Sequence, residues 1–156
     1  MFNWIAFKTP KKDGVKGSFK DFGLKKPETA PTIDAYIGQT TFDIDIKSVT
    51  TKNLARDRKL AKHFFEFMGG NKIKGEFLSL KKKVLKTKIT MNNKTLEVPL
   101  KVERNKQTLK ATGTIDVFDF ALNNQLSAIN KACYKLHEGK TWNVVDLEVF
   151  LKFQDC

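Results

Sequence analysis

Hydrophobic and polar residues alternate along most of the chain, which is the pattern of strands that bury one face. The alternation is strictest near the C-terminal end, where Val145, Leu147, Val149, Leu151 and Phe153 occupy every second position. About eight segments show this strand character. They are residues 2–7, 15–19, 42–46, 72–80, 84–91, 95–102, 109–117 and 145–153.

Turn residues separate several of these segments. Asn92-Asn93 between two alternating runs is the strongest hairpin signal, and residues 9–14 predict a turn between the first two strands. Pro99 lies inside a predicted strand, and we expect its amide position to face away from a neighbour or to sit at a bulge, because proline has no N–H to donate. Residues 23–36 contain Gly23, Pro27 and Pro31 and are predicted to form a loop.

Two segments change to helical spacing. Residues 53–68 are predicted to form one or two short helices that start at Thr51 or Asn53 and end at Gly69-Gly70. Residues 123–137 are predicted to form a second helical segment that ends at Gly139. Its predicted buried face consists of Leu122, Leu126, Ile129, Cys133 and Leu136.

The order of these elements predicts the fold class. The strands follow one another with few helices between them, so the chain has no alternation of strand and helix that would indicate a parallel sheet. We therefore expect an all-β protein, a single domain over residues 1–156, built as an antiparallel closed or nearly closed barrel with at most three short helices.

Phenylalanine is the unusual component of the composition, at 13 of 156 residues. This excess indicates a large aromatic core or an apolar cavity lined with rings. Hydrophobic residues make up 40% and charged residues 29%, which is ordinary for a globular domain. No apolar run reaches the roughly 18 residues of a membrane-spanning helix.

The net charge of +12 suggests an anionic partner, but the kind of cation weakens that interpretation. Of the 29 basic residues only Arg56, Arg58 and Arg104 are arginines, and the lysines are spread along the chain. Arginine is the residue that reads bases and phosphates with two hydrogen bonds, whereas lysine is a solvated point charge. A solvated lysine surface is therefore favoured, with a weakly anion-binding surface second and nucleic acid third.

Candidate catalytic chemistry is sparse. Cys133 and His137 have the spacing to share a helix face, but no orienting third group or further metal ligand accompanies them. Asp43 and Asp45 point to one face of a predicted strand, where solvated carboxylates are ordinary. No phosphate loop, nucleophile elbow or metalloprotease motif is present, so we expect a protein that is not an enzyme and has no metal site.

One basic segment is a candidate for holding a polar head group. Arg56, Arg58, Lys59, Lys62 and His63 lie within eight residues. Lys59 and His63 are four residues apart, so a helix brings them to one face. The segment is either a polar mouth of a binding site or a surface ion cluster that braces the helix.

Several segments, in their order, resemble the YceI-like family of periplasmic lipid-binding proteins. The resemblance covers most of the chain. It is carried by Gly14–Phe19, Phe42–Val49, Asn53–Leu60 with Phe64-Phe65, Ile89–Asn93 with Val98–Leu100, and Ala111–Phe120.

This resemblance implies an eight-stranded lipocalin-like barrel with a helix across one end and an elongated apolar tunnel. It also implies an isoprenoid or fatty lipid ligand, such as a polyprenyl chain, a quinone tail or a fatty amide, and often a homodimer. No cofactor other than such a bound lipid is expected. It implies a periplasmic location, with the leader absent from this chain, or a cytoplasmic one if Met1 is the true start.

The predicted site has two parts. The aromatic and apolar side chains expected to line the tunnel are Trp4, Phe19, Phe42, Phe64, Phe65, Met68, Phe77, Ile89, Phe118 and Phe120. The head-group candidates are Arg56, Lys59 and His63. The alternatives are a barrel whose core is filled by side chains and a small basic barrel that binds nucleic acid or another anionic polymer. Cys133 and Cys156 are expected to be free thiols rather than a disulfide.

Overall fold

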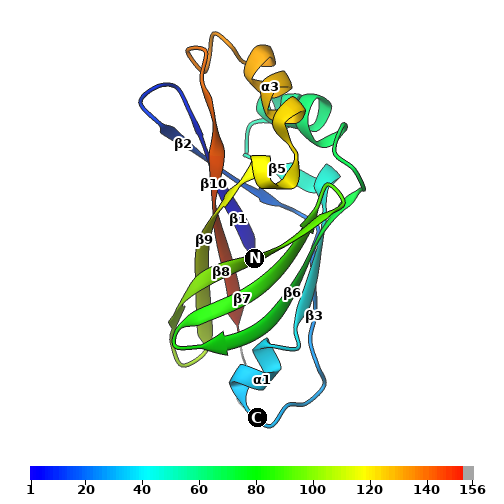
Figure 1. The fold of residues 1–156 in the computed structure, drawn as a ribbon, viewed down its shortest axis with the longest axis vertical. Coiled ribbons are helices and arrows are strands. Elements are labelled where there is room, and N and C mark those ends of the chain that lie inside the picture. The colour runs from blue at the N-terminus through cyan, green and yellow to red at the C-terminus, as the bar shows by residue number, and fades with distance from the viewer. Residues whose placement is uncertain (153–156) are drawn as a thin grey trace.

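The computed structural model describes residues 1–152, which form a curled antiparallel sheet with short helices at both of its ends (Figure 1). The ten strands are β1 Phe2–Lys8, β2 Asp13–Phe19, β3 Phe22–Lys25, β4 Thr41–Asp45, β5 Val49–Thr50, β6 Lys72–Lys81, β7 Val84–Met91, β8 Lys94–Arg104, β9 Thr108–Asp116 and β10 Thr141–Lys152. The helices are α1 Ile33–Ile37, α2 Leu54–Leu60 and α3 Asn123–Ala132, with a π-helical turn η2 Ala61–Phe65 and 3₁₀ turns η1 Ile46–Ser48 and η3 Val117–Phe120.

The sheet has the strand order β3-β4-β6-β7-β8-β9-β10-β1-β2-β5 and curls into a half-barrel. Residues 41–50 connect its two ends, because β4 pairs with β3 and β6 while β5 pairs with β2. The predicted count of eight strands is therefore wrong. Each of the eight predicted segments forms a strand, and two short strands are added. β3 lies in the segment predicted to be a loop, and β5 follows the bend at η1, which interrupts the strand pattern.

Pro99 behaves as its missing N–H requires. It pairs with Lys86 of β7, and the ladder between β8 and β9 begins only at Lys101. Pro99 therefore has no ladder partner in β9, which agrees with the first of the two expected arrangements.

The first predicted helix exists, but its second half has a different hydrogen-bonding pattern. Asn53 is the N-cap, since its side chain accepts a hydrogen bond from the backbone N–H of Arg56 at 3.1 Å. After α2 the chain widens into η2, where the backbone N–H of Glu66 donates to the carbonyl of Ala61. Such π-turns occur frequently at functional sites.

The second predicted helix is shorter than its apolar spacing suggested. α3 ends at Ala132, and residues 133–139 form consecutive turns. Ile129 and Cys133 are buried as predicted, but Leu136 is 64% exposed. The prediction that Leu136 lies on the buried face is wrong. α3 ends at Ala132, so the helical turn that would have placed Leu136 on that face does not form.

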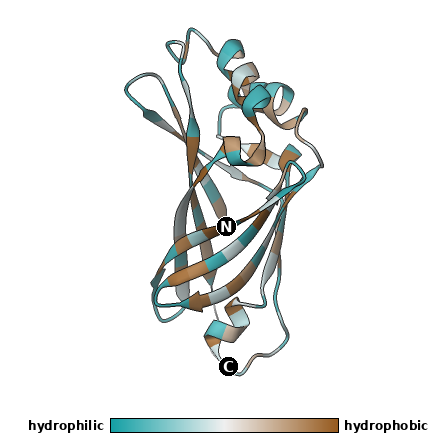
Figure 2. Ribbon diagram, viewed as in Figure 1, coloured by the Kyte–Doolittle hydropathy of each residue, from teal (hydrophilic) through white to brown (hydrophobic). Residues whose placement is uncertain are grey.

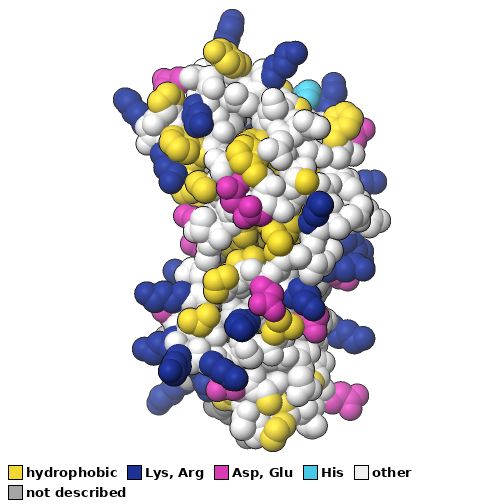
Figure 3. Space-filling view, viewed as in Figure 1, with side chains coloured by type: hydrophobic (Ala, Val, Ile, Leu, Met, Phe, Trp, Pro, Cys, Tyr) yellow, Lys and Arg dark blue, Asp and Glu magenta, His cyan; other side chains and the backbone are white. Residues whose placement is uncertain are grey.

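Alternation along the strands directs the apolar side chains into the curl of the sheet. Figure 2 shows hydrophobic and hydrophilic residues alternating along β6, β7 and β8. Lysine and arginine side chains are spread over the face seen in Figure 3 rather than gathered in one patch. The predicted solvated lysine surface matches this distribution.

Candidate functional site

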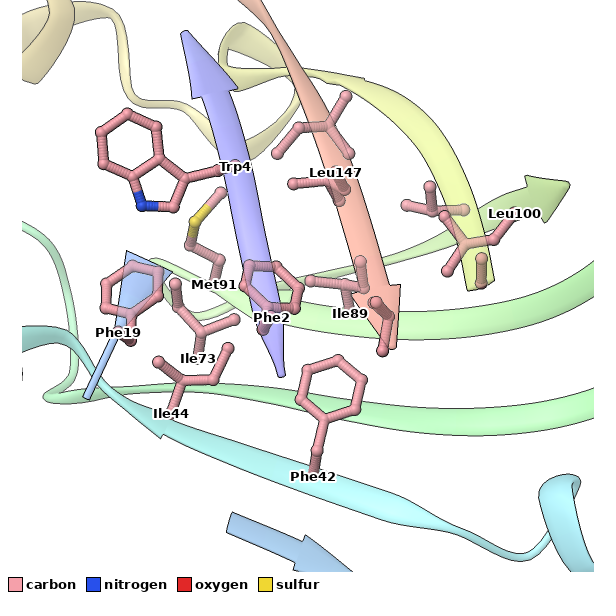
Figure 4. Close-up of a cluster of buried hydrophobic side chains, with 14 of the residues drawn as sticks. Phe2, Trp4, Phe19, Phe42, Ile44, Ile73, Ile89, Met91, Leu100 and Leu147 are labelled. Atoms are coloured by element: carbon pink, nitrogen blue, oxygen red, sulfur yellow. The ribbon is translucent and has the colours of Figure 1, made fainter. Parts of the chain in front are cut away.

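The interior of the curl contains a cavity of about 150 Å³ with almost entirely apolar walls. β1, β2, β4, β6, β7, β9 and β10 contribute side chains to it, and α2, η2 and α3 cover it. Figure 4 shows how side chains from these strands converge, with Trp4, Phe19, Met91 and Ile73 around one space.

The cavity occupies only the half of the interior next to α2 and α3. On β7 its lining residues are Ile89 and Met91, whereas Leu85, further along the strand, is fully buried and does not reach it. On β10 the lining stops at Leu147, and Val149 lies in packed core. The tunnel that we expected is therefore a cavity at the helical end, and the other half of the interior is filled by side chains.

The phenylalanine excess forms a continuous series of rings that connects these two halves. Phe64 contacts Phe65 edge to face with ring centroids 5.1 Å apart, and Phe65 contacts Phe19 in the same way at 5.8 Å. The series continues through Phe2 to Phe42 and ends at Phe77, which is fully buried. The rings thus act both as cavity wall and as packed core.

Two lining rings depend on glycines in neighbouring strands. Trp4 pairs with Gly17 of β2, and Phe42 pairs with Gly75 of β6. A Cβ atom at either glycine would overlap the partner ring. The absence of a side chain at these two positions therefore sets how far each ring extends toward the strand beside it.

Trp4 also carries a polar atom that is not satisfied. Its Nε1–H is buried and has no hydrogen-bond acceptor among the described residues. An unpaired buried donor costs about 1–3 kcal/mol. A ligand oxygen that reached this N–H would offset that cost.

Polar groups gather where the cavity reaches the surface. Lys8 of β1, Arg56 and Lys59 of α2, and His137 all line it and are partly exposed. Trp142 lies beside them, with Lys140 Nζ 4.7 Å and Lys12 Nζ 5.4 Å from its ring. We call this opening the mouth of the cavity.

His137 is held in place by two hydrogen bonds in series. Its Nδ1 lies 2.6 Å from Thr141 Oγ1, whose hydroxyl donates to Asn130 Oδ1 at 2.9 Å. Because the Thr141 hydroxyl donates its proton to Asn130, its oxygen accepts the hydrogen bond from His137. Nδ1 therefore carries the proton in neutral His137, and Nε2 is free to accept one. Burial lowers the pKa of His137 below its usual range, and the nearby Lys8, Arg56 and Lys59 lower it further. The mouth therefore favours an anion over another cation.

The structure separates the predicted lining residues into three groups. Trp4, Phe19, Phe42, Phe64, Phe65 and Ile89 line the cavity. Met68, Phe77 and Phe120 are buried in the core outside the cavity. Phe118 is 44% exposed, so its predicted place in the lining is wrong. It lies in the 3₁₀ turn η3, where the period-two pattern that placed it inward no longer applies.

The predicted head-group residues are divided in a similar way. Arg56 and Lys59 line the cavity, but His63 does not. His63 lies in η2, whose wider turn breaks the four-residue spacing that was used to place it beside Lys59. His137 takes the corresponding place from the other side of the mouth. Sequence reasoning missed it as a site residue because the turns after α3, not a helical period, bring it there.

Cys133 is buried in the cavity wall, and the predicted free thiol at Cys156 lies outside the described residues. Within residues 1–152, no group of three or more His, Cys, Asp or Glu side chains is placed to hold a metal ion. Among the described residues, no helix has the length and hydropathy to cross a membrane.

A curled antiparallel sheet with helices over an apolar cavity defines a class of barrel-like β-proteins with a hollow interior. Comparison with family models makes the assignment specific, because residues 4–153 match the YceI-like domain. The chain belongs to the YceI-like family. Comparison with curated protein sequences gives no significant match.

Solved structures agree on the fold. BcnA of Burkholderia cenocepacia is 15% identical with a TM-score of 0.67, and the alignment covers 98% of this chain and 96% of that one. A polyisoprenoid-binding domain from Saccharophagus degradans is 14% identical with a TM-score of 0.63, covering 98% and 93%. The YceI protein of Campylobacter jejuni is 19% identical with a TM-score of 0.63, covering 92% and 86%.

Proposed function

We propose that this protein binds a long-chain isoprenoid or a similar lipid without catalysing a reaction, with the apolar tail in the cavity and the polar head at the mouth. The observation that carries the proposal is the apolar cavity, which opens between cationic side chains at one end. Family membership and the fold shared with a polyisoprenoid-binding domain support it.

The size of the cavity bears on how a tail enters. A cavity of about 150 Å³ has the volume of one that holds a single benzene molecule. A tail of several isoprene units therefore requires side chains to move aside. The series of phenylalanine rings below the cavity is the place where the space would extend, because Phe2, Phe19 and Phe42 form its floor.

The head group is held by charge and hydrogen bonding in this proposal. Arg56 and Lys59 supply fixed positive charge, and protonation of His137 Nε2 adds a donor beside them. Charge-assisted hydrogen bonds to a phosphate or carboxylate are about twice as strong as neutral ones. A prenyl phosphate or a long-chain carboxylate fits this mouth better than a cationic lipid does.

The nucleic-acid alternative has less support. It needs aromatic rings exposed between cations on one face of the sheet. Phe19, Phe42 and Phe77 instead point into the curl and are buried. The filled-core alternative describes only the half of the interior away from the helices.

The tail-binding proposal predicts the effect of blocking the cavity. Ala6 lines it, whereas Ile5, the preceding residue of β1, has its side chain near Gly14 on the other face of the sheet. Ala6→Trp should abolish uptake of a fluorescent prenyl lipid, and Ile5→Trp should leave uptake within about two-fold of the wild type. Native mass spectrometry of the delipidated proteins with added lipid measures both. Equal uptake by the two variants would contradict the proposal, provided that circular dichroism shows both folded.

The head-group assignment has a separate test. Lys59→Gln combined with His137→Gln should weaken binding of a prenyl phosphate more than binding of the neutral prenol of equal tail length. Lys62→Gln combined with His63→Gln makes the same residue changes outside the cavity lining and serves as the control. If the first pair weakens both ligands equally, these residues do not hold the head group.

A further inference from the structure

Two of the segments that border the mouth carry exposed apolar side chains. Leu54, at the start of α2, is 72% exposed, and Tyr134 and Leu136, after α3, are 61% and 64% exposed. Single exposed apolar residues are ordinary. Three large exposed apolar side chains on the two segments that border the mouth are unusual.

The backbone holds these segments together at one end of the molecule. The N–H of Thr9, in the β1–β2 turn, donates to the carbonyl of Lys140 at 2.9 Å, and the N–H of Gly139 donates to that of Tyr134. Arg56 of α2 and His137 line the same mouth. Figure 1 shows the β1–β2 turn, the chain after α3 and the α2 segment at the same end, opposite α1.

The segments around the mouth also carry exposed lysines. We define the mouth surface as Leu54, Tyr134 and Leu136 with Lys11, Lys12, Lys52, Lys135 and Lys140. The acids of these segments are partly engaged. Asp13 and Glu138 are exposed, and Asp13 accepts a hydrogen bond from Thr9, while Asp57 accepts two from Thr51. These three acids are outnumbered by the five lysines. The surface is therefore cationic around an apolar centre.

This combination fits one kind of partner. Lysines attract the phosphates of an anionic bilayer, while leucine and aromatic side chains enter the layer between head groups and acyl chains. Trp142, which lines the cavity and has Lys12 Nζ and Lys140 Nζ close to its ring, adds an amphipathic aromatic side chain beside the mouth. A nucleic acid would use the cations but gain nothing from Leu54 and Leu136.

We propose that the mouth surface docks on anionic phospholipid bilayers, with Leu54, Tyr134 and Leu136 inserted below the phosphates. Docking in this orientation places the mouth against the membrane, so a lipid passes between bilayer and cavity without crossing water. The passage of lipid rests on the proposed function, whereas docking itself does not.

Co-sedimentation with vesicles tests the docking. The wild type should bind vesicles of phosphatidylcholine with 30% phosphatidylglycerol and bind pure phosphatidylcholine vesicles at least ten-fold more weakly. Leu54→Ser/Leu136→Ser should lower the affinity for anionic vesicles at least ten-fold at unchanged net charge. Unchanged affinity would overturn the proposal.

A matched charge control lies at the other end of the molecule. Lys11→Glu/Lys135→Glu should reduce vesicle binding at least ten-fold. Lys82→Glu/Lys83→Glu lowers the net charge by the same amount in the β6–β7 turn, beside the 42%-exposed Val84, and should stay within two-fold of the wild type. Equal loss in both variants would show that net charge alone drives binding and would overturn the proposal.

Two further measurements separate the remaining outcomes. If Leu54→Ser/Leu136→Ser turns a dimer into a monomer in ultracentrifugation without changing vesicle binding, the surface is a contact between two copies and the proposal is wrong. Prenyl-lipid uptake, measured by native mass spectrometry in detergent-free solution, should be unchanged in the docking variants. Vesicle binding without any uptake by the wild type would support docking and contradict the proposed function alone.

Discussion

At the scale of single residues, the shape of the cavity depends on where side chains are missing as well as where they are present. Gly17 and Gly75 leave room for the Trp4 and Phe42 rings, which could not occupy their places beside a Cβ atom. The Trp4 N–H and the His137 imidazole are among the polar groups that distinguish this wall from ordinary core.

Gly17→Ala should destabilise the fold by about 1–3 kcal/mol, because the Trp4 ring must leave a well-packed place. Urea unfolding measures the loss, and a shifted tryptophan emission reports the moved ring. Gly14→Ala is the control on the same strand. Its Cβ would meet the Ile5 side chain at 3.3 Å, so its effect should stay below about 1 kcal/mol. A loss as large in Gly14→Ala as in Gly17→Ala would contradict the role given to Trp4.

His137 predicts a pH dependence. Burial lowers its pKa in the folded state below the value of 6.5 expected when unfolded, so the unfolded chain binds the proton more tightly. The free energy of unfolding should therefore fall as the pH drops below about 6.5 toward the folded-state pKa. In His137→Gln this part of the slope should disappear from urea unfolding measured between pH 7 and 5. An unchanged slope would show that other groups dominate.

At the scale of elements, the β7–β8 turn of the sheet holds both the end of the η2 segment and the turn η3. Asn92 and Asn93 both adopt positive φ, as the two-residue hairpin between β7 and β8 requires. Asn92 also accepts a hydrogen bond from the N–H of Gly69 at 2.7 Å and donates to the carbonyl of Phe120 at 2.8 Å. The hairpin signal in the sequence thus also marks the point that holds the end of η2 and the turn η3.

The two asparagines offer a matched pair of variants. Asn92→Gly keeps the positive φ but removes the hydrogen bonds to Gly69 and Phe120 and a longer one to the Ala121 carbonyl, and we expect it to cost about 1–3 kcal/mol of stability. Hydrogen exchange should rise at the Gly69 amide. Asn93→Gly keeps the same backbone geometry, so it should have little effect on that amide. Faster exchange in both variants would mean that the turn conformation, not the Asn92 side chain, restrains the helices.

At the scale of the whole molecule, charge acts mainly through repulsion. The net charge is +12, and each ion pair among the described residues is at the surface with its atoms 3.4 Å apart. Surface pairs of this kind contribute about 0–1 kcal/mol. Added salt therefore removes little favourable attraction, because the ion pairs contribute little. It screens much of the unfavourable repulsion between lysines.

The free energy of unfolding should rise when NaCl is increased from about 10 mM to 150 mM, over which the screening length shortens from about 30 Å to 8 Å. Thermal unfolding at pH 7 measures the change. Chloride is the appropriate salt, because sulfate also strengthens apolar burial. A fall in stability over this range would mean that ion pairs outweigh the repulsion.

The sequence alone determined which residues turn inward along each strand, because period-two alternation reports the direction of a side chain relative to its own backbone. It identified eight of the strands, Asn53 as one of two candidate caps, and a wall that contains Trp4, Phe19 and Phe42. Each of these follows from local pattern.

Only the tertiary structure decided which inward side chains face the cavity and which face one another. Phe42 and Phe77 both lie on the apolar side of their strands, yet Phe42 lines the cavity and Phe77 is packed in the core. Likewise His137 reaches the mouth while His63 does not, and Leu136 is left exposed. The physical reason is that periodicity describes one element at a time, whereas a cavity and its mouth arise from the spacing between elements far apart in the chain.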